Sequence, residues 1–122
     1  MRENLIVNKS KAFALDIINL YKFLTEEKKE YVLSKQLLRS GTSIGANVRE
    51  GVRGQSKADF ISKMPIALKE ADETMYWLEL LNESSYIDDI LFIDISSKCN
   101  ELIKILVSIT KTALANNSRI IN

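Results

Sequence analysis

The chain has 122 residues, of which 46% are apolar and 27% are charged, and its net charge is +1. These values indicate one globular domain, and no apolar run approaches the ~20 residues that a transmembrane helix needs. Four glycines, one proline and one cysteine leave few turns and no intrachain disulfide. We therefore expect a single domain, residues 1–122, that is rich in long helices, cytoplasmic and free of membrane contact.

The first two predicted helices cover residues 11–27 and 31–53. Ser10 is a candidate N-cap for the first helix, because its side chain can accept a hydrogen bond from the first turn. The apolar residues of this helix recur every three or four positions, at Phe13, Ile17, Leu20 and Leu24. The second helix has one apolar stripe, at Leu33, Leu37, Ile44, Val48 and Val52.

The last two predicted helices cover residues 57–83 and 89–116. The third has a heptad-like seam at Ile61, Met64, Leu68, Ala71, Met75 and Leu78. Pro65 falls inside this seam, so we expect a kink or a restart of the helix there. Asp88 or Asp89 can open the fourth helix. Because short polar links join the four helices, we predict an all-α, antiparallel up-down-up-down four-helix bundle.

All four glycines fall within residues 39–54, RSGTSIGANVREGVRG. A glycine-rich loop could bind phosphate, but no strand precedes this stretch and it has neither phosphate-loop nor dinucleotide spacing. Gly41 and Gly45 are one helical turn apart, among other small residues. We interpret the stretch as a helix whose small side chains let a neighbouring helix approach closely, with Gly54 as its terminator.

Charge is unevenly distributed along the chain. Residues 33–69 contain seven basic and two acidic side chains, whereas residues 70–101 contain one basic and nine acidic side chains. The predicted topology gathers basic residues at one end of the bundle, the basic end: Lys9, Lys11, Arg49, Arg53, Lys57, Lys63, Lys111 and Arg119. The opposite, acidic end collects Glu26, Glu27, Glu30, Glu79, Glu83, Asp88, Asp89 and Asp94, offset by Lys22, Lys28 and Lys29.

The basic end is a candidate phosphate-binding surface. A solvated polar surface, or complementary charges between subunits, would explain the same distribution.

Catalytic chemistry has little support in the residue types present. The chain has no histidine, which removes the commonest general base and metal ligand. Glu70, Glu73 and Glu101 could form an all-carboxylate metal site, but a solvated or ion-paired surface explains them more simply. Cys99 lies on the apolar stripe of the fourth helix and is interpreted as a core residue. We therefore expect no enzyme activity, cofactor or metal.

Several blocks of the sequence together resemble one known family. They are LLRSGTSIGANVREG, QSKADFISKM, IALKEADETMYWLELL and ELIKILVSITKT. The chain resembles the small four-helix-bundle proteins encoded in intervening sequences of bacterial 23S ribosomal RNA genes, and the resemblance extends from Phe13 to Thr112. That family is similar to the accessory protein of diversity-generating retroelements, a five-membered ring that binds nucleic acid through basic surface. The resemblance implies a homopentamer and binding to RNA or DNA; it departs at Pro65.

The matched blocks contain residues that we assign to an interface or to buried polar structure. Tyr76 and Trp77 fall beside the seam, and the acidic residues around them favour a subunit contact over base stacking. A buried Ser43–Asn47 pair would need a hydrogen-bond partner, such as Glu70 or Glu73 or a neighbouring subunit. The full set is Arg39, Ser43, Asn47, Glu70, Glu73, Tyr76 and Trp77.

We expect a non-enzymatic protein that assembles with itself and binds RNA through Arg49, Arg53 and Lys57. Lys11 and Lys63 would extend this basic surface. The alternative is a protein–protein interaction or assembly module that binds no nucleic acid. Pairing of Arg49 and Arg53 with nearby acidic side chains would favour that alternative.

Overall fold

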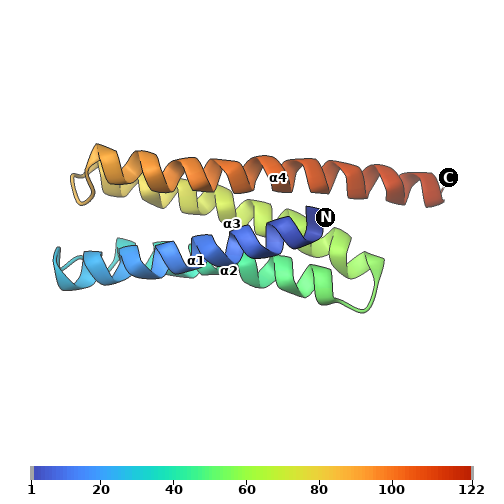
Figure 1. Ribbon diagram of the computed structural model, residues 1–122, viewed down its shortest axis with the longest axis horizontal. Helices are drawn as coiled ribbons and strands as arrows, with labels where there is room; N and C mark the ends of the chain where they lie inside the picture. Colours follow the sequence, from blue (N-terminus) through green and yellow to red (C-terminus); the bar gives the residue numbers. More distant parts are fainter. Residues whose placement is uncertain (1, 122) are drawn as a thin grey trace.

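The computed structural model describes residues 2–121, and its described side chains belong to residues 3–116. The helices are α1 (Arg2–Glu26), α2 (Leu33–Arg53), α3 (Lys57–Glu83) and α4 (Asp89–Ile121). They run alternately up and down, so the α1–α2 and α3–α4 turns lie at one end and the α2–α3 turn lies at the other (Figure 1). The described residues form no strand. This arrangement confirms the predicted all-α four-helix bundle.

Each helix turns one apolar stripe toward a common core. The predicted stripes supply most of it, because the buried apolar side chains recur three, four or seven residues apart within each helix. The largest of these side chains are Ile6, Ile17, Leu24, Leu37, Ile44, Val48, Met64, Leu78, Leu81, Leu102 and Leu106. Neighbouring helices along the chain pack extensively, whereas α1 and α4 touch over a smaller area. Ion pairs of 3.1 Å, Lys9–Glu101 and Lys98–Asp16, join α1 to α4.

Glycines let α2 approach its two neighbours closely. A Cβ atom at Gly41 would lie 2.9 Å from the side chain of Ile17 on α1. A Cβ atom at Gly51 would lie 2.7 Å from the Met64 methyl group on α3. Both distances are shorter than real Cβ contacts allow. A larger residue at Gly41 would displace Ile17 or its helix, whereas at Gly51 the flexible Met64 methyl group would have to move. The glycine-rich stretch is therefore a closely packed helix, as predicted, and not a phosphate loop.

A few polar side chains are buried inside the bundle. The hydroxyl oxygens of Ser40 on α2 and Thr74 on α3 lie 2.9 Å apart, and both side chains are fully buried. Only the tertiary structure shows this link, because its two hydroxyl groups come from different helices. Cys99 is also fully buried, its Sγ lies 3.4 Å from the Ala71 carbonyl oxygen, and burial raises its pKa to about 12. The interpretation of Cys99 as a core residue is confirmed.

The start of the first helix corrects a prediction. α1 begins at Arg2 rather than at residue 11. Ser10 is not its N-cap: the residue is fully buried, and its hydroxyl donates to the carbonyl oxygen of Val7 at 3.2 Å. The reason is that Ile6, also fully buried, extends the apolar stripe one heptad before Phe13. The apolar stripe that continues to Ile6 is therefore a better guide to the start of the helix than the local capping pattern at Ser10.

Other helix bounds also differ from expectation. α2 begins at Leu33, and α4 continues to Ile121 instead of ending at residue 116. α3 runs without interruption from Lys57 to Glu83, so the predicted restart at Pro65 is wrong. Pro65 is exposed, and water can satisfy the carbonyl group that its missing N–H leaves free.

Candidate nucleic-acid interface

The basic end is built from the start of α1, the end of α2 and the start of α3. The N-terminus, the α2–α3 turn and the C-terminal part of α4 all lie toward this end of the bundle (Figure 1). Gly45 of α2 packs on Ser10 of α1, since a Cβ atom there would lie 3.4 Å from the Ser10 backbone. Lys11 follows Ser10 directly, and Arg49 lies one helical turn after Gly45. Together with Lys57 at the start of α3, these residues bring cationic side chains from three helices to the basic end.

Most of the predicted nucleic-acid-binding residues have no acidic partner. Lys11, Arg49, Arg53 and Lys57 are exposed, and within the described side chains none of these four forms an ion pair. Lys63 differs, because its Nζ lies 3.1 Å from Glu50 Oε2. These observations favour a surface that is available to an anionic ligand.

Two further members of the basic end are less informative. Lys9 is paired with Glu101 at 3.1 Å, so its charge is partly compensated. Arg119 lies outside the residues whose side chains are described.

The turn between Arg53 and Lys57 closes without using either cation. The Ser56 hydroxyl oxygen caps α3 by accepting a hydrogen bond from the Asp59 amide at 3.2 Å. The Asp59 carboxylate in turn accepts one from the Gln55 amide at 3.0 Å. Ser56 is therefore the N-cap of α3, and the turn is held by its own polar groups. The neighbouring cations are left free for a ligand.

A cavity of about 680 Å³ opens at the same end, between the end of α2, the start of α3 and the C-terminal part of α4. Its apolar wall includes Val52, Phe60, Ile61 and Ile109. Its polar lining comprises Glu3, Ser56, Lys57, Thr112 and Asn116. This cavity could not be predicted from the sequence, because its lining residues come from all four helices.

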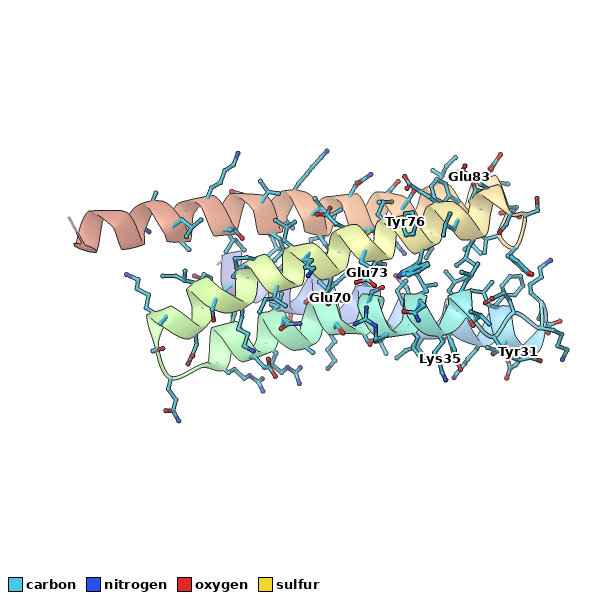
Figure 2. All side chains as sticks on the ribbon, turned by 180° about the vertical axis from the view of Figure 1, so that it is seen from behind. Tyr31, Lys35, Glu70, Glu73, Tyr76 and Glu83 are labelled. Atoms are coloured by element: carbon cyan, nitrogen blue, oxygen red, sulfur yellow. The ribbon has the colours of Figure 1, made fainter. Side chains whose placement is uncertain are left out.

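A network of side chains lies between α2 and α3 and joins five of the predicted interface residues. Arg39 Nη2 lies 2.7 Å from Glu73 Oε1, and its Nη1 lies 3.7 Å from Glu70 Oε2. The Trp77 indole N–H donates to Glu73 at 3.4 Å, and the Trp77 ring meets Tyr76 edge-on at 5.2 Å. Figure 2 shows Glu70 and Glu73 on the side of α3 that faces α2.

This network holds Arg39 at the seam between two helices. Both carboxylates raise the pKa of the Arg39 guanidinium, chiefly through the hydrogen bond to Glu73. Glu70 Oε2 is buried and accepts no hydrogen bond within the described residues, so the Arg39 charge is its nearest compensation. The group is structural in character: one guanidinium from α2 joins two carboxylates of α3.

Ser43 and Asn47 do not reach the carboxylates suggested as their partners. The Ser43 hydroxyl donates to the Arg39 carbonyl at 2.6 Å, and the Asn47 amide donates to the Ser43 carbonyl at 2.9 Å. Both side chains are half-buried and bond to their own helix. In the described structure neither side chain forms the suggested contact with Glu70 or Glu73, and a partner in a neighbouring subunit stays a prediction.

At the acidic end, the carboxylates close turns. Glu30 is only 7% exposed and accepts hydrogen bonds from the amides of Val32, Leu33 and Ser34 at 2.7 to 3.0 Å. Burial alone would raise the pKa of Glu30, but these three amide bonds outweigh it and hold the pKa below its ordinary value. The sequence pattern places Glu30 only among the charges of the acidic end, and its capping role follows from the structure alone.

Aromatic side chains are exposed near the acidic end. Tyr31 just before α2 and Tyr76 on α3 are 59% and 53% exposed. Together with Lys35 and Glu83 they lie toward the end that carries the α1–α2 and α3–α4 turns (Figure 2). A surface of this composition suits a contact between proteins.

The described residues show neither a cluster of metal ligands nor a membrane-spanning helix. Among the described residues, no group of three or more potential metal ligands is close enough to hold an ion. No helix in the described part of the chain has both the length and the hydropathy to cross a bilayer.

Comparison with known proteins identifies a family and a solved structure of similar fold. Residues 2–108 match the family described as 23S rRNA-intervening sequence protein. The fold is similar to a crystal structure of a protein with unknown function from the S23 ribosomal protein family of Bacteroides thetaiotaomicron, with a TM-score of 0.89. The two chains are 56% identical, and the match covers 91% of this chain and 99% of the other. No functionally curated protein matches the sequence.

Proposed function

The chain belongs to the 23S rRNA-intervening sequence protein family, and from this premise we propose that it is a non-enzymatic protein that assembles with itself and binds RNA at its basic end. The observation that carries the proposal is the lack of acidic partners for Lys11, Arg49, Arg53 and Lys57 within the described side chains. Acidic residues at the opposite end serve as caps instead.

Exposed cations bind RNA mainly through its phosphates. Such contacts release condensed counterions, so the affinity falls linearly in log salt and depends little on sequence. Arginine can also bind a phosphate with two parallel hydrogen bonds, which lysine does not. Arg49 and Arg53 would therefore position the RNA backbone, and Lys11 and Lys57 would widen the charged surface.

Assembly would multiply these contacts. The resemblance to retroelement accessory proteins points to a homopentamer, and opposite charge at the two ends suits head-to-tail contacts that close into a ring. Ile90 and Ile93 on α4 are 82% and 62% exposed, close in sequence to Asp88, Asp89 and Asp94. Several basic ends in one particle would raise the effective concentration of weak sites.

The decisive experiment is a salt-dependent titration of a structured RNA. The test protein carries Arg49→Gln, Arg53→Gln and Lys57→Gln. A matched control removes three cations near the acidic end, by Lys22→Gln, Lys28→Gln and Lys35→Gln. We expect the test protein to bind about a hundredfold more weakly, with a slope in log salt shallower by about two to three, because up to three phosphate contacts are lost. The control should lose far less affinity.

Assembly mass must be equal in the three proteins before affinities are compared. Equal losses in test and control would mean that only net charge matters, and would overturn the assignment to the basic end. No binding at about 50 mM salt, where electrostatic binding is strong, would overturn RNA binding altogether. The protein–protein alternative would then stand.

A further inference from the structure

We propose that the cavity at the basic end holds an unstacked nucleobase of single-stranded RNA, while Lys57 and Arg53 bind the adjoining phosphates. The inference rests on the proposed function and names the form of nucleic acid that the basic end recognises. It adds a contact to the base, whereas the cationic surface by itself contacts only the backbone.

The cavity has the size and lining that a base requires. Its volume, about 680 Å³, lies within the range of about 300 to 1,000 Å³ that is usual for small-ligand sites. Phe60 supplies an aromatic ring at its wall, and Ile61, Val52 and Ile109 supply aliphatic surface. Phe60 packs against the core with one side while remaining only partly buried. Stacking on such a ring tolerates any base, because every base has a π-face.

Cations next to this apolar wall distinguish a nucleotide from a purely apolar ligand. Lys57 itself lines the cavity and has no acidic partner among the described side chains. Arg53, equally unpaired, ends α2 just before the turn that contributes Gly54 and Ser56 to the lining. A nucleotide places an apolar ring and an anionic phosphate within one residue of each other, and so uses both features. An aliphatic chain would leave both cations without a partner.

The polar lining sets the direction of the bound nucleotide. Glu3 lines the cavity and repels phosphate, so the backbone is expected on the Lys57 side. The hydroxyls of Ser56 and Thr112 and the amide of Asn116 also line it, and can donate or accept at a base edge. A base inside a duplex is stacked and cannot enter, so the site selects unpaired nucleotides.

A smaller hollow at the acidic end shows why a cavity alone is insufficient. It has a volume of about 390 Å³ and is lined by Phe23, Tyr86 and Leu91. Asp88 and Asp89 also line it, with Lys28 as a single cation. Aromatic surface is therefore present at both ends. In the acidic hollow the one cation, Lys28, lies over the Phe23 ring at 5.7 Å, and Asp88 and Asp89 would repel a phosphate beside that ring.

The test compares three RNA probes of equal length, about ten nucleotides, the scale of single-strand binding sites. They are single-stranded oligouridylate, a ribose-phosphate strand without bases, and a duplex. The variant is Phe60→Leu, which keeps apolar volume but removes the ring. The matched control is Phe92→Leu on α4 near the acidic end, another partly buried phenylalanine packed on the core.

We expect wild type to bind oligouridylate best. Phe60→Leu should weaken that binding about fivefold or more, the low end of a base–aromatic stacking contact. It should leave the affinity for the abasic strand and the slope in log salt unchanged. Phe92→Leu should change none of these values. Glu3→Gln should strengthen binding of all strands, since it removes a negative charge from the lining.

A structural readout accompanies the affinities. Methyl NMR signals of Ile61 and Ile109 should shift on addition of oligouridylate but not of the abasic strand, because only the former fills the cavity. Equal affinity for intact and abasic strands, with no effect of Phe60→Leu, would overturn the base site and leave phosphate binding intact. A preference for the duplex would do the same. Failure of every strand to bind at low salt would overturn both proposals.

Discussion

The two ends of the bundle use their charges differently. At the acidic end, Glu30 caps α2 through three backbone amides, and the Asp88 carboxylate accepts a hydrogen bond from the Leu91 amide at 2.8 Å. Asp89 accepts one from the Asn82 side chain at 2.9 Å. At the basic end, the turn closes through Ser56 and Asp59, and the nearby cations Arg53 and Lys57 form no ion pair among the described side chains.

This contrast separates structural charge from available charge. A carboxylate beside a helix N-terminus satisfies amides that have no partner within the helix, so its charge contributes to folding. An unpaired surface cation contributes little to folding and remains ready for an anion. Substitutions at the acidic end should therefore change stability, and substitutions at the basic end should change binding.

The largest effect on stability is expected for Glu30→Ala. The change leaves three amide donors at the start of α2 without their carboxylate, one of them buried. Loss of a cap that makes charge-assisted hydrogen bonds should lower the free energy of unfolding by about 2 kcal/mol. Urea denaturation measures it, with Glu27→Ala at an exposed neighbouring site as control. Similar small losses in both variants would show that the Glu30 cap contributes nothing special.

The same cap should make stability depend on pH. The pKa of Glu30 in the folded state lies below its ordinary value of 4.5. Its contribution is therefore complete above that value and is lost as the pH falls through the folded-state pKa. The stability difference between wild type and Glu30→Gln should be constant near neutral pH and shrink in acid. A difference that stays constant down to about pH 3, below the ordinary glutamate pKa, would contradict this account.

A smaller loss is expected for Asp88→Ala. The Asp88 carboxylate satisfies one amide at the start of α4, that of Leu91. Removing one exposed cap should cost about 1 kcal/mol in the free energy of unfolding. Thermal and urea unfolding both report it, and Asp88→Asn, which retains a capping oxygen, should recover most of the loss. No recovery by asparagine would point to the charge rather than the hydrogen bond.

Freeing a paired cation should produce a modest gain in RNA affinity. Lys63 is held by Glu50 at 3.1 Å, so Glu50→Gln releases its charge at the basic end. We expect affinity to rise about two- to threefold, with a slightly steeper dependence on salt. Glu79→Gln makes the same change in net charge on α3 toward the acidic end and serves as the comparison. An equal gain in both variants would assign the effect to net charge alone.

The smallest effect on stability is expected at the basic end itself. Arg53→Gln and Lys57→Gln alter exposed side chains without an ion pair in the described structure. Each should change the free energy of unfolding by less than about 0.5 kcal/mol, measured in urea at constant m-value. A loss above about 1 kcal/mol would mean that these cations are structural and would remove the distinction between the two ends.

Much of the fold could be predicted because a helix repeats its apolar positions at a fixed spacing. Met64, Ala71 and Leu78 were placed on one seam by their intervals, and all three are fully buried. Gly41 was assigned to a helix because its neighbours kept that spacing. Where a local signal was read in isolation the prediction failed. Ser10 resembled a cap but is core, and Pro65 resembled a break but lies within a continuous helix.

Less of the candidate site could be predicted, because it depends on side chains from several helices. The location of Arg49, Arg53 and Lys57 at one end follows from topology alone. Topology does not determine which of the cations form ion pairs. Lys63 was expected to be available, yet it is paired with Glu50 on α2. The cavity beside Phe60 was not expected at all.

The sequence by itself determined the helices, their order and the gathering of unlike charges at opposite ends, because periodicity, turns and chain direction are local properties. Only the tertiary structure decided that Glu30 is a buried cap, that Ser40 meets Thr74, and that an apolar cavity adjoins the unpaired Lys57. Each of these depends on the rotation and separation of packed helices. Small residues such as Gly51, through the close approach they permit, set that separation.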